Sequence, residues 1–176
     1  MDVIDALAGI DAGSRLDELR AHRPEARTNA QATYDALFSP VDDAAMPLVE
    51  RWAVAAFAAS LFGVPEAEAH YRSQLTEADP ALAMAVAQAL EAGKGEGPYG
   101  SYDGELSTES VPGPDLVLDT QVRDGLGERL AVALEHTHML VLHPRDSSRT
   151  RLQPLVDAGW SADGIVTLSQ LVSFLA

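Results

Sequence analysis

The sequence predicts an all-α fold built around a central helical hairpin. The segment from Met46 to Phe62 is apolar on nearly every face, which is typical of a helix inside a protein. Elsewhere, apolar residues recur with a helical period between proline and glycine signals. The best strand candidate, Leu116–Leu118, is too short to carry a sheet. With 176 residues, we expect one domain (1–176) that comprises N-terminal helices (1–40), a core hairpin and following helix (41–92), a long Gly/Pro-rich loop (93–115) and C-terminal helices (116–176).

The N-terminal part is expected to contain three helical segments. Residues 2–8 fit a short helical turn, and Ser14 is suited to cap a helix from Arg15 to about Ala21. Pro24 is typical of a first helical turn and predicts a helix from Glu25 to Leu37. The inward side of this helix is expected to carry residues that recur at helical spacing, namely Ala26, Ala30, Thr33, Tyr34 and Leu37.

The central helix and its successor form the predicted hairpin. Gly63 ends the first helix, because glycine adopts the left-handed cap without a steric penalty. Pro65 starts the second helix at its first position, and His70 follows within it. We expect the junction Gly63–Pro65 to be buried, and a buried helix start is a common place for chemistry.

Residues 93–115 interrupt the helical pattern, after a helix that begins at Pro80. A structureless segment of this length is generally a lid, an arm or a disordered loop. The segment Gly93-Lys94-Gly95 lacks the Ser or Thr and the preceding strand that a phosphate loop needs, so nucleotide binding is not expected. Tyr99 and Tyr102 are expected to pin the loop to the body of the protein or to a neighbouring subunit.

Helical patterns return in the last part of the chain. A long helix is predicted from Gly127 to about Leu142, and a shorter one contains Leu152 and Leu155. The last helix, Ala162–Ala176, is expected to direct its periodic apolar residues inward, namely Ile165, Leu168, Leu171, Val172 and Leu175. Its apolar end indicates a truncated boundary or a surface that a partner covers.

Composition narrows the classes of function. A net charge of −15 argues against nucleic acid and anionic membranes as partners, since both need a positive patch. The absence of cysteine removes disulfides, thiolate metal sites and thiol catalysis. No signal peptide or membrane-spanning run is visible, so a cytoplasmic, soluble protein without a cofactor is expected.

One pair of residues has the chemistry of a proton relay. Glu50 lies on the central helix and His70 on the next one; histidine titrates near neutral pH, and a carboxylate can fix its tautomer. The alternative is a histidine bonded to a backbone carbonyl and a glutamate at the surface, and the pattern alone favours this alternative.

Three further histidines are candidates for metal ligands. His136 and His138 are two positions apart and therefore face away from each other on a helix, while His143 is about 10.5 Å along the axis from His136. These residues cannot share one metal, and no metal site is expected. The segment from His143 to Asp146 is expected to build a helix stop, with Arg145 and Asp146 paired locally.

Four segments carry a resemblance to a known family: 4–26, Phe38–Leu75, 133–148 and 155–176. In these segments the chain resembles the carboxymuconolactone decarboxylase and alkylhydroperoxidase D-like superfamily, specifically its peroxidase-related branch. The resemblance implies an alkylhydroperoxidase D-like helical domain around a hairpin, assembled as dimers and often as trimers of dimers.

The resemblance also bears on activity. Peroxidase members of that family carry Cys-x-x-Cys at the start of the second hairpin helix, and those positions fall on Gly63 and Glu66. His70 matches the family histidine, whereas Glu50 lies near the family glutamate and Arg51 could occupy its place in a register shifted by one. The resemblance therefore implies a fold without thiol peroxidase activity.

Three hypotheses follow for function. The first is a structural or partner subunit, in a homo-oligomer or with a cysteine-bearing paralogue. The second is an acid/base enzyme of the decarboxylase type on a small organic acid or lactone, using His70 and Glu50, with Arg51 and Arg72 as the nearest cations. The third is a small-molecule binding module that uses the hairpin pocket.

Overall fold

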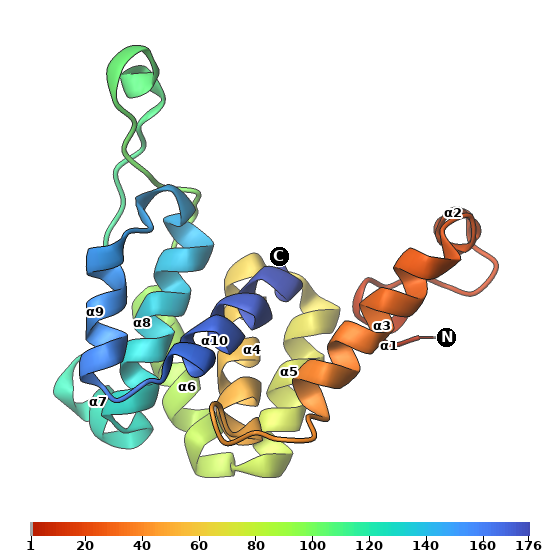
Figure 1. The fold of residues 1–176 in the computed structure, drawn as a ribbon, viewed down its shortest axis with the longest axis horizontal. Helices are drawn as coiled ribbons and strands as arrows, with labels where there is room; N and C mark the ends of the chain where they lie inside the picture. Colours follow the sequence, from red (N-terminus) through yellow and green to blue (C-terminus); the bar gives the residue numbers. More distant parts are fainter. Residues whose placement is uncertain (1) are drawn as a thin grey trace.

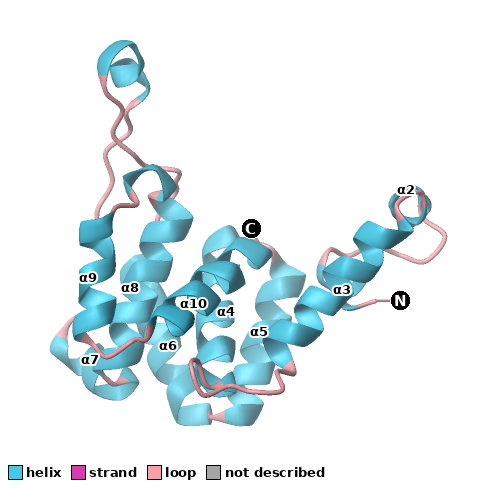
Figure 2. Ribbon diagram, in the orientation of Figure 1, coloured by secondary structure: helices cyan, strands magenta, loops and turns pink. Residues whose placement is uncertain are grey.

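A computed structural model describes residues 2–176, and all the helices and turns in that range confirm the all-α prediction (Figure 2). Strand-like pairing within residues 2–176 is limited to one isolated antiparallel bridge between Gly100 and Val111. Within the same residues, no helix is both long and apolar enough to cross a membrane.

The core is organised around α4 (Leu48–Phe62), whose residues 51–59 are all buried. Four helices pack along α4, the last turn of α3 (Pro24–Phe38) also contacts it, and α10 crosses it in Figure 1. The four helices are α5 (Pro65–Ala78), α6 (Pro80–Gly93), α8 (Glu128–Leu142) and α10 (Ala162–Leu175). A helix that is apolar all round thus occupies the centre, as its composition predicts.

The junction between α4 and α5 corrects one prediction. Gly63 has a left-handed conformation with a φ of 71°, and Pro65 begins α5, as predicted. The junction is nevertheless exposed, and 41% of Val64 is accessible to solvent. The reason is that burial of α4 ends at Ala59, so its last turn emerges from the core before the chain reverses.

The N-terminal helices extend from the body as a separate projection in Figure 1. They are α1 (Val3–Leu7), α2 (Arg15–Ala21) and α3 (Pro24–Phe38). The predicted inward stripe of α3 is wrong at Ala26 and Thr33, which are both exposed. Burial is confined to Leu37 and Phe38, because only the last turn of α3 reaches the core.

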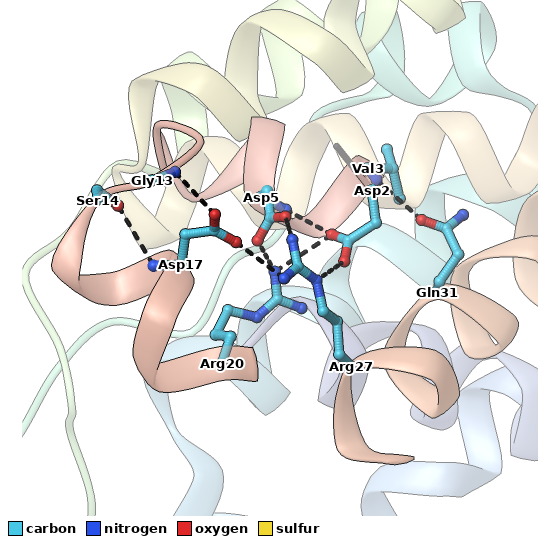
Figure 3. Close-up of polar contacts among 9 residues, drawn as sticks. All are labelled: Asp2, Val3, Asp5, Gly13, Ser14, Asp17, Arg20, Arg27 and Gln31. Carbon is cyan, nitrogen blue, oxygen red and sulfur yellow. Dashed lines mark hydrogen bonds and ion pairs between the residues drawn. The ribbon is translucent and has the colours of Figure 1, made fainter. Parts of the chain in front are cut away.

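A network of charged side chains holds this projection together (Figure 3). Asp5 of α1 is only 2% exposed and pairs with both Arg20 of α2 and Arg27 of α3. Arg27 also bonds Asp2 at 2.9 Å and Asp17 at 2.8 Å. A hydrogen bond from the backbone of Gly13 is the larger cause that lowers the pKa of Asp17, and Arg27 adds to it. These ion pairs join α1, α2 and α3 to one another.

The Gly/Pro-rich segment forms an arm with the short 3₁₀ helix η1 (Gly104–Glu109) at its tip (Figure 1). Its base is attached to the body, as predicted for the two tyrosines. The backbone N–H of Tyr99 donates to the carbonyl of Leu142 at 2.6 Å, and Arg145 lies 5.5 Å from the ring of Tyr102.

The end of α8 corrects the predicted pairing of Arg145 with Asp146. Asp146 instead approaches Nδ1 of His143 at 3.3 Å and accepts a hydrogen bond from the backbone of Ser101. Asp146 therefore bonds the arm and His143, and not Arg145 as the sequence predicted.

The C-terminal part contains three further elements besides α8 and α10. They are α7 (Thr120–Leu126), which the sequence did not predict, the 3₁₀ helix η2 (Pro144–Asp146) and α9 (Arg149–Asp157). In α10, Leu168, Leu171 and Val172 are buried as predicted, while Ile165 and Leu175 are partly buried.

Candidate functional site

Glu50 lies in the first turn of α4 and faces α8. Its carboxylate accepts two hydrogen bonds from the guanidinium of Arg129, from Nε to Oε1 at 2.9 Å and from Nη2 to Oε2 at 3.3 Å. The Glu50 side chain is 15% exposed and that of Arg129 33% exposed. Such two-pronged pairing fixes orientation as well as charge.

Arg129 connects several parts of the fold. It also donates to the backbone carbonyls of Ala45 at 3.0 Å and Gly159 at 3.2 Å. The guanidinium lies 4.0 Å from the ring centroid of Trp160, whose Nε1 donates to the carbonyl of Arg129 at 2.9 Å. Glu50 therefore neutralises a cation that joins α8 to the segments preceding α4 and α10.

His70 lies on α5 and faces α3. Its Nε2 is 2.8 Å from the hydroxyl of Tyr34. The ring centroids of Trp52 and Tyr71 lie 6.4 and 5.0 Å from the imidazole. Burial lowers the pKa of His70, which favours the neutral ring at pH 7. The arrangement is a tyrosine–imidazole contact at the edge of an aromatic cluster.

The structure does not bring Glu50 and His70 together as a proton relay. Their side chains bond different helices, and no hydrogen bond joins them among residues 2–176. The hairpin explains the separation: Glu50 precedes Gly63 by 13 residues and His70 follows it by 7. The six-residue offset is about 9 Å along the helix axes.

In the register shifted by one residue, Arg51 takes the place of the family glutamate, and Arg51 has a structural role. Arg51 is 5% exposed and donates to the carbonyls of Met46 at 2.9 Å and Leu37 at 2.8 Å. It thereby satisfies backbone acceptors at the end of α3 and in the turn before α4. Burial lowers the pKa of Arg51, and the nearby carboxylate of Asp43 opposes the shift.

An open groove lies between α3 and α10 and has a volume of about 1250 Å³. Residues of α3, of the following turn and of α10 line it, including Asp35, Val41 and Phe174. Neither Glu50 nor His70 belongs to its lining. The groove therefore offers a surface for contact but does not connect the predicted catalytic pair.

A smaller cavity of about 230 Å³ lies between α8 and α9, below residues 115–117. We call it the α8–α9 cavity. His136, Met139, Arg151 and Pro154 are among the residues that line it. The sequence marks His136 only as a candidate metal ligand and does not reveal this cavity, because the contact between α8 and α9 leaves no periodic signal.

The three C-terminal histidines have separate environments. Nε2 of His138 is 3.1 Å from the carbonyl of Gly93, and Nε2 of His143 is 3.0 Å from that of Pro114. His136 has no hydrogen-bond partner for its buried Nδ1 within residues 2–176. In the same part of the chain, no group of three or more His, Asp or Glu side chains is placed to share a metal ion.

Comparisons of the chain with protein-family models, with curated proteins and with solved structures found no match.

Proposed function

We propose that the chain is a cysteine-less structural or partner subunit, similar to the peroxidase-related branch of the carboxymuconolactone decarboxylase and alkylhydroperoxidase D-like superfamily. The observation that carries the proposal is the contact between Glu50 and Arg129. The Glu50 carboxylate is held by Arg129 in a contact that joins helices, so it is not available to activate His70. The proposed fold is the family's hairpin domain, placed in the cytoplasm.

The chemistry of the junction supports the same proposal. Gly63 and Glu66 stand where peroxidases of that family carry their cysteines, and the junction is exposed. Glycine offers no side chain, and a carboxylate cannot replace a thiolate as the reductant of a peroxide. A decarboxylase reaction at the hairpin would have His70 and Tyr34 but not the second acid/base group predicted for it.

Exposed apolar side chains support assembly. Leu16 and Leu19 of α2 are 56% and 52% exposed, and Val41 beside the α3–α10 groove is fully exposed. Exposed apolar residues on a projecting helix and beside a groove are available for contact with a partner. We propose that these surfaces join copies of the chain into dimers or trimers of dimers, with a cysteine-bearing paralogue as the alternative partner.

Light scattering coupled to size-exclusion chromatography tests the assembly, and a peroxide-consumption assay tests the absence of thiol chemistry. We expect a mass of two or six chains and no peroxide consumption above buffer. A monomer at micromolar concentration that also fails to bind a cysteine-bearing paralogue would refute the subunit proposal. Turnover that His70→Gln abolishes would show that the hairpin is an active site.

A further inference from the structure

We propose that the α8–α9 cavity binds a small monocarboxylate with a compact apolar body, such as a short aliphatic or an aromatic acid. This site is distinct from the hairpin and does not depend on the proposed subunit role. The proposal is carried by three features that line one cavity: a buried histidine whose Nδ1 has no hydrogen-bond partner within residues 2–176, an arginine with one bonded Nη1, and an apolar wall.

The size of the cavity sets the size of the ligand. Its volume is about 230 Å³. An apolar protein cavity of about 150 Å³ is sufficient to hold benzene. The α8–α9 cavity therefore has room for a single ring or a short chain together with a carboxylate.

His136 supplies the polar floor of the cavity. The residue is 5% exposed, and its buried Nδ1 makes no hydrogen bond within the described residues, although buried polar groups are nearly always bonded. Burial lowers the pKa of His136, and the charge of Arg151 adds to the shift. The carbonyl of Arg151 opposes it. A neutral imidazole has one N–H donor, for which a ligand oxygen would compete with the carbonyl of Arg151.

Arg151 supplies the charge at the mouth. Its Nη1 donates to Asp115 at 2.8 Å, and the two side chains are 37% and 50% exposed. A guanidinium presents several further N–H groups in a planar fork, which matches the two oxygens of a carboxylate. A hydrogen bond from Arg151 lowers the pKa of Asp115, so Asp115 is ionised at neutral pH. Its carboxylate therefore competes with a ligand carboxylate for the guanidinium of Arg151.

The other side chains define what else the ligand carries. Glu135, the second carboxylate of the lining, is already held by Arg123 at 2.5 Å and by the backbone N–H of Leu118 at 2.8 Å. The remaining wall is largely apolar, with contributions from Leu116, Val132, Met139 and Pro154. One anionic group for one guanidinium and a hydrocarbon body for the wall describe a monocarboxylic acid. A dicarboxylate would place its second charge against hydrocarbon.

Isothermal titration of the intact protein with benzoate and with butyrate tests the site, with benzamide as the neutral control of the same shape. We expect saturable binding of at least one acid near about 1 mM and at least about tenfold weaker binding of benzamide. Arg151→Gln should weaken acid binding by about tenfold or more, and Asp115→Asn should strengthen it because the competitor is removed. Arg149→Gln removes the same charge outside the cavity and should leave affinity within about twofold.

Opposite effects of Asp115→Asn and Arg151→Gln on acid affinity distinguish a binding site from a structural ion pair, because breaking a structural pair would weaken binding in both variants. His136→Phe fills the floor and should abolish binding, while circular dichroism confirms that each variant is folded. The proposal fails if neither acid binds at about 10 mM, or if binding is unchanged in Arg151→Gln and His136→Phe. The mass of the assembly is measured separately, so the subunit proposal stands or falls on its own data.

Discussion

Glu50→Gln tests whether the candidate acid/base residue is structural. The substitution keeps the shape of the side chain and removes the charge that Arg129 binds through two hydrogen bonds of 2.9 and 3.3 Å. We expect a lower free energy of unfolding and no change in any reaction rate of the chain.

The size of the effect follows from the contact. A hydrogen bond to a charged group contributes about 1.5–3 kcal/mol. The amide oxygen of the variant would still accept one bond, the second bond is long, and Arg129 is 33% exposed, so solvent screens part of the interaction. We therefore expect a loss of about 2 kcal/mol, and about 4–8 °C in Tm at about 2–4 °C per kcal/mol for a chain of this length.

Urea denaturation followed by circular dichroism measures the change. Glu77→Gln, an exposed glutamate on α5 without an ion pair among the described residues, is the matched control and should stay within about 0.5 kcal/mol of the parent. A double-mutant cycle with Arg129→Met should give a coupling energy of about 1–2 kcal/mol. Stability equal to that of Glu77→Gln would refute the structural role.

Three further outcomes are expected. Gly164→Ala should cost about 1–3 kcal/mol by urea denaturation, because an added Cβ would lie 2.7 Å from the carbonyl of Ala45 and force α10 away. Acid should destabilise the fold: burial lowers the pKa of His136 and His138, so the unfolded chain binds protons more readily, and unfolding free energy should fall below about pH 6.5 by up to about 1.4 kcal/mol per unit and group. Asp5→Asn should accelerate tryptic cleavage within α2, because it removes the buried carboxylate that joins the three N-terminal helices.

Each of these outcomes has a matched control. Gln170→Ala changes an exposed position of α10 and should leave stability unchanged. His136→Gln should flatten the pH dependence between about pH 7 and about pH 5, and an unchanged slope would contradict the assignment. Asp11→Asn alters an exposed aspartate outside the charged network; cleavage as fast as in Asp5→Asn would show that the network does not hold the projection.

Local signals predicted the helices well, because the residues that cap or end a helix lie next to it in the sequence. Asp79 caps α6 by accepting from the N–H of Leu82, and Ser161 caps α10 by accepting from Gly164. The same kind of signal was available for α7, where Asp119 accepts from Val122, but the short helix has too few residues to show a period.

The partners of the candidate site could not be predicted in the same way. Arg129 meets Glu50 across 79 residues, and Tyr34 meets His70 across 36. Periodicity indicates which face of a helix is buried and not which helix will cover it. The burial of the Gly63 junction was overestimated for the same reason, since the apolar run reaches Phe62 while burial ends three residues earlier.

The arginines explain why an anionic substrate is poorly served at the hairpin of this acidic chain. Arg51 directs its donors to backbone carbonyls, and Arg72 is paired with Glu68 one turn away. Arg129 is held by Glu50, so the cations near the hairpin are already engaged in holding helices together. Arg151 differs because its one ionic partner within residues 2–176, Asp115, is half-exposed and replaceable, and because a cavity lies beside it. If the chain recognises a small acid, the structure therefore favours the contact of α8 with α9 over the hairpin.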